Sequence, residues 1–236
     1  MTTIARPDVV DRETWQHARD ALLAREKAHT REGDAIAAAR RRLPMTEVPN
    51  VELVGEHGPV QLLDVFEGRD QLVVYKHMFH TGKPFEDQCE GCTVTQWNVQ
   101  DATYLHEQGV AYAVICEGPW DEVGPFREFM GYTLPWYSAF GVDDPVLGAD
   151  FGAFVAFMRV DDRIFVTYDT TGRGVEAAMA SLRLLDMTVY GRQEVWEDSP
   201  QGWPQRPTCS SWRRDGRPTA QWTRPAVASH SSGRRS

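Results

Sequence analysis

The chain has 236 residues, enough for one large domain with a substantial buried core. Its 34 Asp and Glu outnumber 25 Lys and Arg, and the net charge of -9 argues against nucleic-acid or anionic-membrane binding. Four cysteines are too few for a disulfide scaffold, and no membrane span or secretory signal is seen, so we expect a cytoplasmic protein with reduced thiols.

Residues 1–49 predict a helical extension ahead of the main domain. Apolar residues recur at helical spacing through residues 11–43, and either Asp11 or Thr14 is suited to cap the start of the helix. Gly33, followed by an aspartate, predicts a break into two helical pieces, and Pro44 ends the second piece.

A strand–helix–strand unit is predicted in the first half of the main domain. Short strands over 51–54 and 60–62 are expected to pair as a hairpin. The apolar run at 72–79 is typical of a buried central strand, and 110–116 is a second strand of this kind. A helix over about 93–107 separates these two strands, so they should be parallel, with a right-handed crossover.

The second half of the domain predicts a helix, a hairpin and a final helix. The helices cover about 120–130 and 174–185, and the hairpin strands cover 151–158 and 164–168. A strand–helix–strand unit followed by a hairpin and a helix is the thioredoxin arrangement. We therefore expect residues 50–205 to form a thioredoxin-like α/β domain, a three-layer sandwich around a mixed sheet.

Residues 206–236 differ in composition from the rest of the chain. They contain seven Arg and one Asp, and Val227 is their only large aliphatic residue. Such a segment buries too little apolar surface to offset the entropy lost on ordering. We therefore predict a disordered, Arg/Ser-rich basic tail.

The most informative motif is the Cys-x-x-Cys formed by Cys89 and Cys92, between the first long strand and its helix. Unpaired N–H groups and the positive end of the helix dipole lower the pKa of a cysteine just ahead of a helix. We therefore predict a dithiol-disulfide oxidoreductase in which Cys89 attacks and Cys92 resolves, acting on a protein or small-molecule disulfide without an organic cofactor.

Three carboxylates flank the motif, and they affect its expected redox behaviour. Glu86, Asp87 and Glu90 indicate an exposed site, and their charges disfavour a thiolate. They therefore favour the disulfide over the dithiol, which predicts a reducing couple. The exception is a site where Lys83, or an arginine from elsewhere in the chain, offsets these charges.

Two other functions fit the same residues. A copper or zinc site could use His77 or His106 together with Cys89 and Cys92, a donor set that both metals accept. His80 is three residues after His77, and the two would face opposite sides if the strand continued through both. The remaining alternative is a non-catalytic binding module in which the cysteines are incidental.

The other cysteines and one proline complete the candidates. Cys116 ends an apolar strand and is expected in the core, whereas Cys209 is interpreted as a stray thiol. The aromatic stretch at 132–137 is expected to be irregular, so that Pro135 precedes no clear strand. If Pro135 were cis and faced Cys89, it would match the proline opposite the cysteines in thioredoxins.

Several segments resemble a bacterial family of unknown function with a thioredoxin-like fold, whose members are commonly labelled predicted dithiol-disulfide oxidoreductases. The resemblance spans roughly residues 10–205 and implies that fold, with dithiol chemistry at the Cys-x-x-Cys. Peroxiredoxins are similar in the first hairpin and strand, but neither cysteine of the motif has a threonine three residues before it. The segments that carry the family resemblance are 62–79, 89–93, 131–136, 190–194 and 196–203.

Overall fold

The computed structural model describes residues 5–223, so residues 224–236 of the predicted tail lie outside the described part. The chain begins with helix α1 (Arg12–Arg40), capped by Asp11, whose Oδ1 accepts the Thr14 N–H at 2.8 Å. The predicted break at Gly33 is wrong. No atom lies within 4 Å of a Cβ built there, so this glycine is solvated and costs the helix only about 1 kcal/mol relative to Ala.

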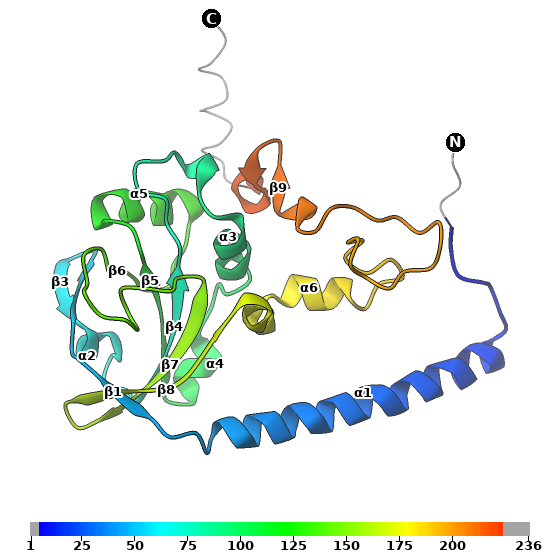
Figure 1. The fold of residues 1–236 in the computed structure, drawn as a ribbon, viewed down its shortest axis with the longest axis horizontal. Coiled ribbons are helices and arrows are strands. Elements are labelled where there is room, and N and C mark those ends of the chain that lie inside the picture. The colour runs from blue at the N-terminus through cyan, green and yellow to red at the C-terminus, as the bar shows by residue number, and fades with distance from the viewer. Residues whose placement is uncertain (1–4, 224–236) are drawn as a thin grey trace, which may run out of the picture.

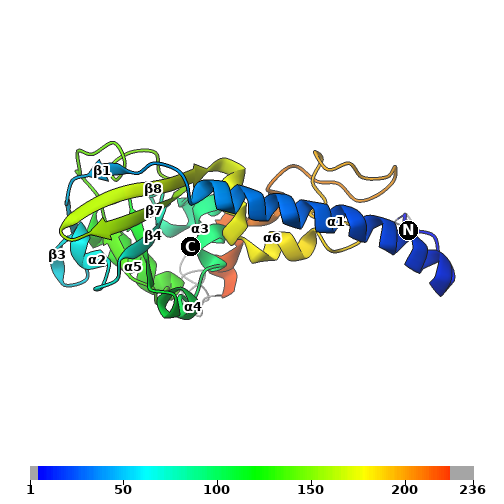
Figure 2. The ribbon, with the colours of Figure 1, turned by 90° about the horizontal axis from the view of Figure 1, so that it is seen from below.

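Helix α1 buries none of its residues. It runs away from the sheet on the side of the molecule where α6 (Ala180–Leu185) lies (Figure 1), and the view from below shows the same arrangement (Figure 2). No helix among residues 5–223 combines the length and the apolar character needed to cross a bilayer.

An eight-stranded mixed sheet forms the centre of the described chain, in the order β1-β8-β7-β4-β5-β6-β2-β3. As predicted, β4 and β5 are parallel, and β7 and β8 form an antiparallel hairpin. The first strand lies inside the predicted helical extension and pairs with β8. The strands are β1 (Thr46–Val48), β2 (Glu52–Gly55), β3 (Gly58–Gln61), β4 (Gln71–His77), β5 (Val110–Cys116), β6 (Trp136–Ser138), β7 (Ala153–Val160) and β8 (Arg163–Thr171).

The helices of the domain depart from the prediction in two places. The expected helix over 93–107 is split, because the Asn98 side chain donates to the Val94 carbonyl at 2.7 Å and Asp101 accepts the Thr103 N–H at 2.9 Å. The expected final helix begins as a 3₁₀ segment. The helices are α2 (Leu62–Val65), η1 (Phe85–Asp87), α3 (Glu90–Trp97), α4 (Thr103–Glu107), α5 (Trp120–Met130), η2 (Gly172–Ala178) and α6.

Successive side chains of the central strands point to opposite faces of the sheet, and a hydrophobic core lies on each face. In β4, Leu72 and Val74 join the cluster that includes α2, whereas Tyr75 joins the cluster with α3 and α5. Cys116 is fully buried, as expected, and burial raises its pKa to about 12. Helices therefore cover both faces of a mixed sheet, which is the predicted three-layer sandwich.

The segment around Pro135 corrects another expectation. The predicted irregular stretch ends in β6, which pairs in parallel with β5, and the Pro135 carbonyl accepts the Val114 N–H at 2.9 Å. All peptide bonds among the described residues are trans. Pro135 lines a cavity with His57 and Arg127 that does not include the cysteine motif. The conditions under which Pro135 would match the thioredoxin proline are therefore not met.

Residues 206–223 are ordered, which contradicts the predicted disorder for this part of the tail. They pack against α3 and η1 (Figure 1), and the buried Gln221 side chain donates to the Phe85 carbonyl at 2.6 Å. A count of aliphatic residues missed this packing because the contacts are made by indole, guanidinium and amide groups. The elements are η3 (Ser210–Trp212), β9 (Arg213–Arg214), β10 (Arg217–Pro218) and η4 (Thr219–Thr223).

Candidate functional site

The loop between β4 and α3 brings the cysteine motif to the helix N-terminus. Buried Gln88 fixes this loop, because its Oε1 accepts the His80 N–H at 2.8 Å. Its Nε2 donates to the carbonyls of His80 and Lys83 at 3.1 and 3.2 Å. The residue that follows Gln88, Cys89, is the N-cap of α3, because this helix begins three residues earlier than predicted. The Cys89 Sγ accepts the Cys92 N–H at 3.5 Å.

The two thiols of the motif have opposite acid–base properties. Hydrogen bonds from the Cys92 thiol, and then from the N–H groups of Cys92 and Gly91, lower the pKa of Cys89 to about 6, although burial and Glu90 oppose this shift. Cys92 is only 1% exposed, and its hydrogen bond to Cys89, together with burial, raises its pKa. The arrangement therefore favours the thiolate at Cys89, with the Cys92 thiol as its hydrogen-bond donor.

An arginine from the C-terminal segment binds the outside of the motif. Arg213 forms an ion pair with Glu90, with 3.0 Å between Nη2 and Oε2. It also donates to the carbonyls of Glu86 and Gln88, each at 2.8 Å. Arg213 is therefore the offsetting arginine that the sequence analysis named as an exception. The ion pair offsets part of the charge of Glu90, which still opposes the thiolate of Cys89.

A cavity of about 400 Å³ lies beside the motif, lined by Cys92 and also by Cys209. Cys209 is therefore part of the wall of a cavity rather than the stray thiol expected from the sequence. Trp196 and Trp212 line the same cavity, and neither was assigned to a site. No local pattern could have found these residues, because they reach the cysteines only through the packing of residues 190–212.

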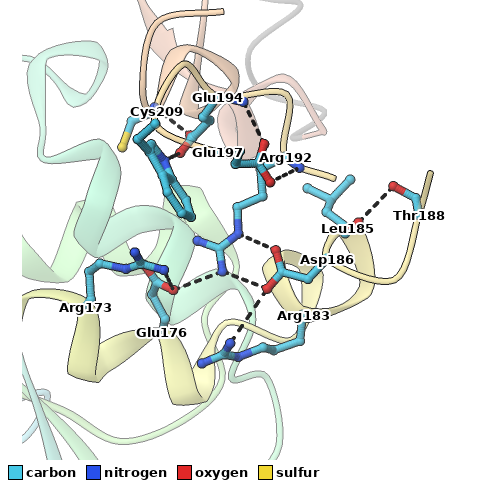
Figure 3. Close-up of polar contacts among 11 residues, drawn as sticks. Arg173, Glu176, Arg183, Leu185, Asp186, Thr188, Arg192, Glu194, Glu197 and Cys209 are labelled. Atoms are coloured by element: carbon cyan, nitrogen blue, oxygen red, sulfur yellow. Dashed lines mark hydrogen bonds and ion pairs between the residues drawn. The ribbon is translucent and has the colours of Figure 1, made fainter. Parts of the chain in front are cut away.

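Ion pairs made by the largely buried Arg192 side chain fix the wall of this cavity (Figure 3). The Arg192 side chain is 5% exposed and donates to Asp186 at 2.7 Å and to Glu176 at 3.0 Å. Glu194 accepts the Cys209 N–H at 2.7 Å and the Trp196 Nε1–H at 2.5 Å. These bonds connect η2, α6 and the segment before η3, and they explain why a stretch with little regular structure is held in place.

The ligand set of the metal alternative is not assembled. His77 is fully buried, and its Nδ1 lies 2.7 Å from the Met78 carbonyl. Burial lowers the pKa of His77 to about 4, and its ring packs against Trp136 and Phe126. His106 lies on α4. Among the described residues, no three His, Cys, Asp or Glu side chains are grouped in a way that could hold a metal ion.

The helix-covered mixed sheet, with a cysteine pair at the start of a helix after a central strand, defines a thioredoxin-like protein. Residues 4–217 match the family described as "Bacterial protein of unknown function (DUF899)", and the chain belongs to that family. No curated protein matches the chain.

Two solved structures are similar at low sequence identity. Peroxidoxin BcpB from Mycobacterium tuberculosis is 21% identical with a TM-score of 0.40, over 60% of this chain and 97% of that one. A secreted Mycobacterium tuberculosis disulfide oxidoreductase homologous to E. coli DsbE is 15% identical with a TM-score of 0.35, over 56% and 96% of the chains.

Proposed function

We propose that this protein is a thiol-disulfide oxidoreductase in which Cys89 is the attacking thiol and Cys92 the resolving thiol. The observation that supports this assignment is the unequal environment of the two sulfurs. Cys89 is partly exposed at the N-cap of α3, with a pKa lowered to about 6, whereas Cys92 is buried behind it with a raised pKa. Disulfide exchange requires a nucleophilic thiolate at neutral pH and a neighbouring protonated thiol that acts in the second step.

The reaction transfers two electrons from the protein to its substrate. The Cys89 thiolate attacks one sulfur of a protein or small-molecule disulfide, the substrate S–S bond breaks, and the leaving thiolate takes up a proton. Cys92 then loses its proton and attacks the Cys89 sulfur of the mixed disulfide, which releases the second thiol. A dithiol reductant must afterwards reduce the Cys89–Cys92 disulfide to complete a cycle.

The environment of Cys92 is suited to its change from a protonated thiol to an attacking thiolate during this reaction. The charge on Cys89, and its hydrogen bond with Cys92, contribute to the raised pKa of Cys92. Both disappear once Cys89 is bound in a mixed disulfide, whereas the Met78 N–H, 3.3 Å from the Cys92 sulfur in the reduced protein, is a separate donor to that sulfur. The pKa of Cys92 therefore falls at the stage when its thiolate is needed.

A thiol titration with peptide mapping tests the proposal. We expect a mild oxidant to remove two thiols reversibly and to yield a peptide that links Cys89 to Cys92. Cys92→Ser should accumulate a mixed disulfide at Cys89, and Cys89→Ser should accumulate none. The proposal is refuted if Cys89 is alkylated no faster than an unstructured cysteine at neutral pH, or if oxidation links neither residue of the motif.

A further inference from the structure

The cavity beside the motif has the size and lining of a small-molecule site. Its volume of about 400 Å³ lies within the range of ligand pockets in proteins. Its walls come from β4, α3, η2 and the segment from Arg192 to Trp212, so it is shaped by tertiary structure. The side chains that give it an apolar character are Tyr75, Met78, Val175, Met179, Trp196 and Trp212.

The charged residues in the wall already interact with partners in the protein. Arg173 donates to Glu176 at 2.9 Å, and Arg192 pairs with Glu176 and Asp186. Glu194 accepts hydrogen bonds from an indole and from a backbone N–H. A charged ligand would lose hydration and compete with these pairs, whereas an uncharged apolar ligand would leave them intact.

The cavity also reaches the cysteine motif. Cys92 and Gly91 line it, and a Cβ built on Gly91 would lie 3.4 Å from the Trp212 ring and 3.9 Å from the Cys89 sulfur. Trp212 and the Cys89 sulfur therefore flank Gly91. A ligand whose body lies in the cavity can rest on this indole while it presents a sulfur atom to Cys89.

From this arrangement we propose that the cavity binds the body of a small, uncharged, apolar or aromatic disulfide and presents it to Cys89. This inference rests on the proposed function and specifies its substrate class. The reduced protein converts one such disulfide into two thiols and becomes the Cys89–Cys92 disulfide. A dithiol reductant returns the protein to its reduced form.

Two disulfides of the same shape test the inference on the reduced full-length protein. Dithiobis(benzamide) is uncharged, and dithiobis(benzoate) is a dianion. The oxidation rate with each probe is divided by its rate with a free cysteine peptide, which removes the difference in intrinsic reactivity. We expect the uncharged probe to be favoured by about tenfold or more, because desolvating a carboxylate beside satisfied ion pairs costs at least about 1.4 kcal/mol.

A matched pair of variants tests whether the cavity is responsible. Thr208 is an exposed residue at the cavity wall, and Thr133 is an exposed threonine in the separate cavity beside Pro135. Thr208→Trp should slow the reaction with dithiobis(benzamide) by about tenfold while Cys89 alkylation by iodoacetamide stays unchanged. Thr133→Trp should change neither rate.

The outcomes separate this inference from the proposed function. Equal normalised rates for the two probes, or a Thr208→Trp variant that reacts as fast as the Thr133→Trp variant, would overturn the substrate class while leaving the dithiol chemistry in place. Failure of both probes to form the Cys89–Cys92 disulfide would overturn both proposals. A preference for the uncharged probe that disappears in Thr208→Trp supports the inference.

Discussion

Replacing Arg213 by alanine perturbs the cysteine motif without touching either sulfur. The substitution removes the ion pair with Glu90 and the two hydrogen bonds to the carbonyls of Glu86 and Gln88. Glu90 follows Cys89 directly, and its charge already opposes the thiolate. An unpaired Glu90 should therefore raise the pKa of Cys89.

The expected shift follows from the exposure of the pair. The side chains of Arg213 and Glu90 are 32% and 38% exposed, so solvent screens their charges and the pair contributes at most about 1 kcal/mol. Because one pKa unit corresponds to about 1.4 kcal/mol, we expect the pKa of Cys89 to rise by at most about 0.7 unit. The lost hydrogen bonds should lower the free energy of unfolding by about 2 kcal/mol.

The assay is the pH dependence of Cys89 alkylation by iodoacetamide, with the modified residue identified by peptide mass. Arg214→Ala is the matched control, because Arg214 is mostly exposed and lies 3.9 Å from its partner, Asp215. Adding Glu90→Gln to Arg213→Ala should return the pKa of Cys89 toward its original value. That double variant should not recover the stability lost with the hydrogen bonds to the loop carbonyls.

Two results would refute the reasoning. An unchanged alkylation profile in Arg213→Ala would show that the C-terminal segment does not influence the motif. An equal shift in Arg214→Ala would show that general positive charge, rather than the pair with Glu90, affects Cys89.

Three further predictions concern pH and packing. Because the pKa of Cys89 is lowered from 9.0 to about 6, its thiolate stabilises the fold fully above about pH 9, and this contribution disappears as the pH falls through 6. Urea unfolding of the reduced protein at several pH values should show this trend. The Cys89→Ser variant should not show it. The pKa of His77 is lowered from 6.5 to about 4, so the protein should lose up to about 3 kcal/mol of stability as the pH falls from 6.5 to 4. Acid titration of His77→Phe should not show this loss. A Cβ at Gly118 would lie 2.3 Å from the Phe79 ring, so Gly118→Ala should cost about 1–3 kcal/mol in urea unfolding, and Gly118→Ala/Phe79→Leu should recover part of that cost if the clash is the cause.

Local signals predicted most of the sheet and the position of the motif. The apolar runs that became β4 and β5 are typical of central strands whatever lies beside them. Gly131 ends α5 with a φ of 68°, a conformation in which glycine has no Cβ penalty. Cys89 is an N-cap because the residues just after it form a helix. These features depend on neighbours within a few residues.

The errors arose where side chains competed with the local pattern. The apolar spacing over 93–107 favours one helix, but Asn98 and Asp101 bond to nearby backbone groups and divide it. Residues 206–223 lack large aliphatic residues, and composition therefore indicated disorder. Their order comes from contacts such as the bond from Gln221 to the Phe85 carbonyl, across 136 residues.

The sequence alone determined the two parallel central strands and the place of the cysteine motif between the first of them and a helix, because both follow from backbone preferences and apolar spacing over short distances. Only the tertiary structure decided the charge around that cysteine and the cavity beside it. Arg213 meets Glu90 across 123 residues, and Trp212 lies against Gly91, because the chain returns to α3 after the sheet is complete. Such contacts depend on how distant elements pack, a quantity that no short window of sequence contains.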